Sequence, residues 1–198
     1  MKKGIAFFDF DGTITTKDTL LEFIKFSKGN LPFYTGFLLR SPYLVAYKLK
    51  IISNQAAKQK VLQYFFGNTT IEQFQQYCSS FAKTILPGLI RPAALEEIAR
   101  HKANGITVVI VSASPENWIS EWTRSLGIEL IATRLVASNG KITGLIEGKN
   151  CHGEEKVRRI REQYNLGDYE AVYAYGDTSG DKPMLGLAKH AYYKPFRD

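Results

Sequence analysis

Apolar and polar residues follow one pattern at the start of the chain and another in the third that follows. Residues 5–10 are an apolar run that ends in Asp9-Phe10-Asp11, which predicts a buried strand leading into a loop. From residue 18 to about 81, apolar side chains recur three or four positions apart, a spacing typical of helices. This second segment is therefore predicted to be helical, without strands.

After Pro87-Gly88, strand patterns alternate with helix patterns. Strands are predicted at 106–111, 129–132 and 171–175, and helices at 92–104, 115–126, 153–164 and 181–188. A hairpin is expected over 134–144 with its turn at Asn139-Gly140, a dipeptide suited to tight turns. Alternation of this kind implies a parallel sheet with crossover helices.

The predicted fold class is therefore α/β, with a Rossmann-like parallel sheet core and an all-helical cap inserted after the first strand. We expect residues 1–16 and 87–198 to form the α/β catalytic core and residues 17–86 to form the cap. At 198 residues, the chain is long enough for such a core with a smaller inserted module.

Polar clusters lie at the ends of three predicted strands, where open parallel sheets bind their ligands. These clusters are residues 9–13, 112–114 and 176–181, and Lys156 lies at the start of a predicted helix. Their convergence would make a single pocket.

Asp9 and Asp11 are two residues apart at a predicted strand end, so both carboxylates are expected on one side. Two carboxylates that close repel each other, and a bound cation would relieve the repulsion. With Asp177 as a third oxygen donor the cation would be hard, and Mg²⁺ fits best. Zinc is disfavoured because Cys151-His152 lacks further partners. The alternative is that these acidic residues are solvated loop charges.

Ser112 ends a predicted strand, and Pro115 starts the predicted helix behind it. A serine hydroxyl and the free amides of a helix N-terminus form an anion site. The alternative is that Ser112 or Ser114 is an ordinary N-cap. Taken alone, Lys156 is expected to be a surface lysine, since it lies among other charged residues.

In their order along the chain, these features resemble the four signature motifs of the haloacid dehalogenase (HAD) superfamily. The motifs here are Asp9-Phe10-Asp11-Gly12-Thr13, Ser112, Lys156, and residues 176–181. The resemblance covers essentially the whole chain. The dehalogenases themselves lack the second aspartate of the first motif, so Asp11 indicates a phosphatase, a Mg²⁺-dependent phosphoric monoester hydrolase.

The resemblance implies a reaction through an aspartyl-phosphate. Asp9 would be the nucleophile, and Asp11 would act as general acid and then general base. The phosphoryl oxygens would be bound by a further set of residues, namely Ser112, Lys156, Gly12, Thr13 and Ala113.

The same resemblance implies the metal ligands. Mg²⁺ would be held by Asp9, by Asp11 through its carbonyl, and by Asp177. Asp181 would orient Lys156 or the waters on the metal.

The helical insert and the Gly-x-x-Lys spacing that ends at Lys156 resemble the phosphoserine-phosphatase-like (IB) branch of this superfamily. Departures from enzymes of phosphoserine specificity fall at Gly12, Asp18, Ala113-Ser114 and Gly180. Asp18 stands where those enzymes carry a glutamate for the substrate amine, so it is a candidate substrate contact from the cap. Bacterial phosphatidylglycerophosphate phosphatases are similar in three segments, 113–115, 151–153 and 181–185.

Charge is concentrated in the predicted cap. The chain has a net charge of +7, and residues 17–86 hold nine basic and three acidic residues together with thirteen of the 25 aromatic residues. Such a cap suits an anionic bilayer, with residues 31–40 as the best candidate for interfacial contact. The alternative is that the aromatic residues form the cap's own core.

The expected partner is thus a phosphorylated substrate, either a lipid head group such as that of phosphatidylglycerophosphate or a small metabolite such as phosphoserine or a sugar phosphate. A non-enzymatic alternative is a basic module that binds phosphate or nucleic acid. No nucleic acid is expected, because the charge lies in a helical cap without a recognisable nucleic-acid fold.

Two cysteines, Cys78 and Cys151, lie far apart without a CxxC pair, which fits a reducing compartment. The apolar run near residue 5 is interrupted too early for a signal peptide, and residues 31–52 carry too many charges and prolines to span a membrane. We expect a cytoplasmic protein, with peripheral contact at the inner membrane surface as an option.

Overall fold

A five-stranded parallel sheet forms the core of the computed structural model, which describes residues 4–197. Its strand order is β3-β2-β1-β6-β7. The strands are β1 (Ile5–Phe8), β2 (Thr107–Pro115), β3 (Glu129–Thr133), β6 (Val172–Gly176) and β7 (His190–Tyr193). This confirms the predicted α/β class with a Rossmann-like sheet.

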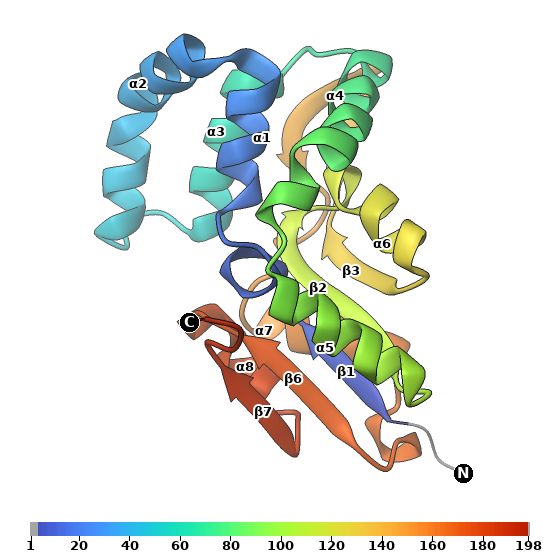
Figure 1. Cartoon of the computed structure of the whole chain (residues 1–198). Helices are drawn as coiled ribbons and strands as arrows, with labels where there is room; N and C mark the ends of the chain where they lie inside the picture. The colour runs from blue at the N-terminus through green and yellow to red at the C-terminus, as the bar shows by residue number, and fades with distance from the viewer. Residues whose placement is uncertain (1–3, 198) are drawn as a thin grey trace.

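Helices cover both faces of this sheet (Figure 1). They are α5 (Pro92–Ala103), α6 (Ser120–Leu126), α7 (Glu154–Gln163) and α8 (Lys182–Leu185). In β1, Ala6 and Phe8 belong to the apolar cluster that includes α5, whereas Ile5 and Phe7 belong to the cluster that includes α7 and α8. Because both faces of β1 are buried, its sequence is a continuous apolar run and does not alternate.

Four helices follow β1: α1 (Thr19–Lys28), α2 (Asn30–Lys48), α3 (Asn54–Phe66) and α4 (Ile71–Thr84). Side-chain oxygens of Asp18, Ser53 and Thr70 cap the first, third and fourth of them. Phe23 packs within 4.5–5.7 Å, between ring centroids, of four other aromatic residues, Phe66, Phe74, Phe81 and Trp118. Much of the aromatic content of this segment is therefore its own core. None of the helices within residues 4–197 is long and apolar enough to cross a membrane.

The predicted hairpin is present as β4 (Leu135–Ser138) and β5 (Lys141–Ile146), with its turn at Asn139 and Gly140. It packs against α3. A Cβ added at Gly144 would lie 2.4 Å from the backbone nitrogen of Gln63, so only glycine allows this close approach. The Ile146 amide donates a hydrogen bond to Gln59 at 2.9 Å, which further fixes α3 against β5.

Two elements differ from the sequence predictions. The helix predicted from Pro115 begins only at Ser120, because β2 continues to Pro115 and still pairs there with Thr133 of β3. A short 3-10 turn at Glu116–Trp118 separates strand and helix. The edge strand β7 was not predicted; it is only four residues long, and its last three residues are exposed.

Replacing Gly144 by alanine should destabilise the protein by about 2 kcal/mol or more. The positive φ of 76° and the approach to the α3 backbone both oppose a side chain there. Urea denaturation gives the free energy of unfolding. The matched control is Gly140→Ala, which has a similar φ of 72° but nothing within 4 Å. Equal losses in the two variants would contradict the close packing of hairpin and helix.

Candidate active site

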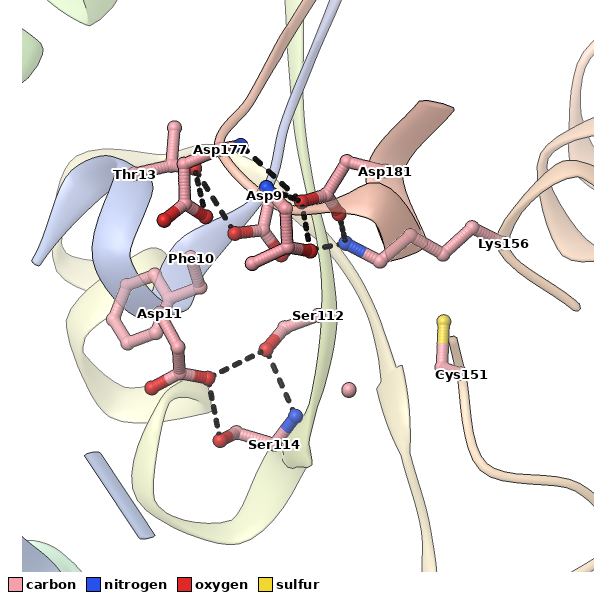
Figure 2. A network of polar contacts seen from close by, with 12 residues as sticks. Asp9, Phe10, Asp11, Thr13, Ser112, Ser114, Cys151, Lys156, Asp177 and Asp181 are labelled. Carbon is pink, nitrogen blue, oxygen red and sulfur yellow. Dashed lines mark hydrogen bonds and ion pairs between the residues drawn. The ribbon is translucent and has the colours of Figure 1, made fainter. Parts of the chain in front are cut away.

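The polar clusters predicted at strand ends come together at one edge of the sheet (Figure 2). Asp9 follows β1, Asp177 follows β6, and Ser112 and Ser114 lie in the last part of β2. Phe8 pairs with both Ile110 and Tyr175, so the three strands end side by side. The parallel register thus explains the convergence that the sequence predicts.

A buried ion-pair cluster lies at the centre of the site. The ammonium group of Lys156, in the first turn of α7, donates to Asp9 Oδ1 at 2.5 Å and to Asp181 Oδ1 at 2.7 Å. Lys156 is only 1% exposed, so the expectation from its local sequence alone, a surface lysine, is wrong. The other oxygen of Asp181 accepts hydrogen bonds from the amide and hydroxyl of Thr178. Asp181 therefore holds the lysine in place.

Burial changes the proton affinities of this cluster. Burial raises the pKa of Asp9 to about 7, although the charge of Lys156 acts in the opposite direction. Burial lowers the pKa of Lys156, but the charges of Asp9 and Asp181 raise it by more, so the lysine keeps its proton. Another cation beside Asp9 would favour the charged form of this carboxylate.

Carboxylate oxygens of Asp9, Asp177 and Asp181 lie within 4.8 Å of one another, and all three residues are buried. The hydroxyl of Thr13 lies 3.0 Å from Asp9 Oδ2 and 3.2 Å from Asp177 Oδ1. A donor set made only of carboxylates fits a hard divalent cation such as Mg²⁺. Both oxygens of Asp181 already accept hydrogen bonds, one from Lys156 and the other from Thr178 and the Asp177 amide, whereas Asp9 Oδ2 and Asp177 Oδ1 share the single hydroxyl of Thr13. Asp9 and Asp177 are therefore the carboxylates that could hold such a cation.

Asp11 faces a different set of partners. Its Oδ1 accepts hydrogen bonds from the hydroxyl of Thr19 at 2.6 Å and from the Thr19 amide at 2.7 Å. Its Oδ2 accepts one from Ser114 at 2.6 Å, and the hydroxyl of Ser112 lies 3.5 Å away. Figure 2 shows its carboxylate directed to the two serines and away from Lys156.

The reason lies in the backbone after β1. The strand ends at Phe8, and residues 10–14 form a turn in which Gly12 has a φ of 82°. Phe10 is part of this turn, so the backbone between Asp9 and Asp11 is not continuously extended, as the expectation of two carboxylates on one side requires. The carboxylate of Asp11 lies outside the acidic cluster, and a metal contact through its carbonyl stays a prediction.

Ser112 is fully buried, and its hydroxyl accepts a hydrogen bond from the Ser114 amide at 3.0 Å. No α-helix starts at Pro115; a 3-10 turn at Glu116–Trp118 follows β2, and α6 begins at Ser120. A phosphate contact from Ser112 stays a prediction. The alternative, an ordinary N-cap, is wrong, because Ser112 and Ser114 both lie within β2.

A cavity of about 350 Å³ lies between these strand ends and the helical segment. It is lined by Asp9, Asp11, Ala113, Lys156 and Asp181 and, from the helical segment, by Asp18, Leu20, Tyr47, Asn54 and Lys58. Asp18 thus lies where a substrate contact was expected, although its carboxylate also accepts the Leu21 amide at 3.1 Å as the cap of α1.

Lys58 was not among the predicted site residues. It extends from α3, and its ammonium group donates to the carbonyl of Ala113 at 2.9 Å. Burial lowers its pKa, while the charges of Asp11 and Asp18 raise it. Nothing in the sequence distinguishes Lys58 from the other lysines of this segment. Thr19, which positions Asp11, was also not predicted, because nothing in the sequence around it indicates this contact.

Arg197 is a further residue that the sequence did not indicate. Its guanidinium donates to Asp177 Oδ2 at 2.5 Å. The negative charge on this side of the acidic cluster is therefore partly balanced from the C-terminal segment.

Comparisons with known proteins show the family of this chain. A family model described as haloacid dehalogenase-like hydrolase matches residues 6–186. The chain is 38% identical to the protein CicA of Caulobacter vibrioides over 195 residues, which cover 96% of this chain and 85% of CicA. It is 27% identical to the phosphoserine phosphatase of Methanocaldococcus jannaschii, with 94% and 83% of the two chains covered.

A solved structure described as a phospho-aspartyl intermediate analogue of phosphoserine phosphatase has the same fold. It superimposes with a TM-score of 0.62 at 23% identity, covering 95% of this chain and 84% of that one. The family model and the length of the match to CicA show that this chain belongs to the haloacid dehalogenase-like hydrolases.

Proposed function

We propose that this protein is a Mg²⁺-dependent phosphomonoester hydrolase that acts through an aspartyl-phosphate on Asp9. The observation that carries the proposal is the buried Asp9 carboxylate, held 2.5 Å from the ammonium of Lys156 in a cavity that also contains Asp11. Relatives that include a phosphoserine phosphatase support the reaction class. Phosphoryl transfer needs positioning and charge neutralisation above all, and this cluster supplies both.

In the first step, an oxygen of Asp9 attacks phosphorus, and the bond from phosphorus to the ester oxygen breaks. Asp11 gives its proton to the departing alkoxide. In the second step, water attacks the phosphorus of the aspartyl-phosphate and Asp11 takes up a proton from this water. The bond from phosphorus to the Asp9 oxygen breaks, which frees the Asp9 carboxylate and releases inorganic phosphate. Hydrogen bonds from Thr19 and Ser114 keep Asp11 oriented for both proton transfers.

Two sets of groups would neutralise the negative charge of the phosphoryl group. Lys156 is positioned to contact the phosphoryl oxygens beside Asp9, with Ser112, Gly12, Thr13 and Ala113 as further contacts. A Mg²⁺ ion held by Asp9 and Asp177, with the carbonyl of Asp11, would supply further positive charge to the phosphoryl group.

For the substrate we propose a lipid phosphate, with phosphatidylglycerophosphate as the example. Lys58 adds a positive charge to the cavity side that faces the leaving group, which favours a second anionic group in the substrate. Tyr47 lines the same cavity, and Ile51 just beyond it is 72% exposed, so apolar surface adjoins the cavity. The alternative, a small metabolite such as phosphoserine, is supported by the name of one relative and by Asp18 in the cavity.

Asp9→Asn should abolish hydrolysis of p-nitrophenyl phosphate in the presence of Mg²⁺, because an amide cannot form the aspartyl-phosphate. Release of p-nitrophenol measures turnover, and circular dichroism checks that the variant is folded. Full turnover by a folded Asp9→Asn protein would rule out this mechanism.

Asp11→Asn should lower kcat by a factor on the order of 10² or more, since the leaving group would lose its proton donor. Release of inorganic phosphate from an alkyl phosphate measures it. The loss should be smaller for p-nitrophenyl phosphate than for an alkyl phosphate, because p-nitrophenolate leaves without protonation more readily. An unchanged kcat toward alkyl phosphates would remove Asp11 from the proposed acid–base role.

Phosphatidylglycerophosphate in mixed micelles should be hydrolysed with a higher kcat/KM than phosphoserine or glucose 6-phosphate. Lys58→Gln should raise the KM for the lipid by roughly tenfold, the effect of losing one charge-assisted hydrogen bond. The matched control is Lys60→Gln, which changes an exposed lysine on the same helix. A preference for phosphoserine would support the metabolite alternative and contradict the lipid substrate.

A further inference from the structure

An apolar stripe follows one side of α2 and faces solvent. We call it the α2 stripe, and it consists of Leu31, Tyr34, Leu38, Val45 and Leu49. These residues are 75%, 62%, 74%, 55% and 65% exposed. They follow one another at three, four or seven positions, so they share one side of the helix and continue one residue past its end. Large apolar side chains gathered in this way indicate an interaction site.

The opposite side of α2 is already occupied. Phe33 and Gly36 are buried, and Phe37 packs against Phe65 of α3 at 5.6 Å between ring centroids. A Cβ at Gly36 would lie 2.4 Å from the ring of Phe65, so the two helices are in close contact. Figure 1 shows α2 at the outer edge of the helical segment, beside α1 and α3. The side of α2 that packs on the protein is therefore opposite the α2 stripe, which faces solvent.

The positive charge around the α2 stripe indicates which kind of partner the stripe binds. Residues 23–71 contain seven lysines and arginines and no aspartate or glutamate. Lys48 and Lys50 are exposed next to Leu49 at the end of the stripe. A second copy of this surface would offer the same positive charges and no opposite ones. An anionic lipid surface offers both the apolar layer and the negative charge.

We propose that the α2 stripe, with Lys48 and Lys50, docks this protein onto the surface of an anionic bilayer. The chain would lie on the membrane with the apolar side chains in the headgroup region. Residues 47–54 connect this surface to the catalytic cavity, because Tyr47 and Asn54 line that cavity. Docking would therefore place the cavity next to lipid headgroups, and this last step rests on the proposed lipid phosphatase function.

Sedimentation with vesicles of phosphatidylcholine and phosphatidylglycerol in equal parts tests the docking directly. The unmodified protein should sediment with these vesicles and less with phosphatidylcholine alone, and binding should weaken as salt rises. The double variant Leu38→Glu/Leu49→Glu should bind at least about tenfold more weakly. Both positions are exposed, and neither lines the catalytic cavity, so hydrolysis of p-nitrophenyl phosphate should be unchanged.

The matched control is Leu95→Glu, an exposed leucine on α5, which should bind vesicles like the unmodified protein. A second variant, Lys48→Gln/Lys50→Gln, keeps every apolar side chain and should lose most of the preference for phosphatidylglycerol. Absence of vesicle binding, or equal binding by the Leu38→Glu/Leu49→Glu and Leu95→Glu proteins, would overturn the proposal. So would a dimer in gel filtration that only the stripe variant disperses. Vesicle binding without hydrolysis of lipid phosphates would contradict the proposed substrate and leave the docking surface standing.

Discussion

The buried ion pair between Lys156 and Asp9, shared with Asp181, is the interaction on which the site depends. An ammonium group inside a protein is stable only when carboxylates replace its water, and removing one partner from such a pair costs about 3–5 kcal/mol. The three residues come from α7, from the end of β1 and from the loop after β6. Their mutual attraction therefore fixes three separate parts of the chain in one geometry.

This arrangement leaves negative charge beside the lysine. Asp177 also lies in the acidic cluster, and it is linked to Asp9 through Thr13. Burial raises the pKa of both Asp9 and Asp177, so their charged forms gain from an additional cation. Burial of these neighbouring carboxylates is thus unfavourable in the absence of a metal ion. The same arrangement suits the cluster to Mg²⁺ and to a phosphoryl group.

The sequence predicted the sheet and its polar strand ends because these depend on local patterns. Three apolar runs lead into Asp9, Ser112 and Asp177. Each run has buried side chains on both faces of the sheet. The parallel register then brings their ends together without further information. Lys156 became a candidate only through its place in the order of motifs, since its neighbours in sequence are charged.

Other parts of the site depend on tertiary contacts that no local pattern reveals. Pro115 suggested a helix start, but pairing with β3 extends the strand past it. Lys58 points into the cavity because the hairpin fixes α3 against the protein, and Thr19 reaches Asp11 because the chain turns sharply at Gly12. The sequence indicated residues 31–40 as a candidate for interfacial contact, but not which of their side chains are exposed, since Phe33 and Phe37 are packed against neighbours whereas Leu38 on the same helix is exposed.

The most direct test of the account is to identify the residue that carries the phosphoryl group during turnover. The protein would be mixed with Mg²⁺ and substrate, quenched in acid, digested and analysed by mass spectrometry. The account predicts one phosphoryl group on the peptide that contains Asp9, located on Asp9 itself and lost when the peptide is exposed to alkali. A phosphoryl group on another residue, or turnover with no phosphorylated peptide under conditions that preserve acyl phosphates, would contradict it.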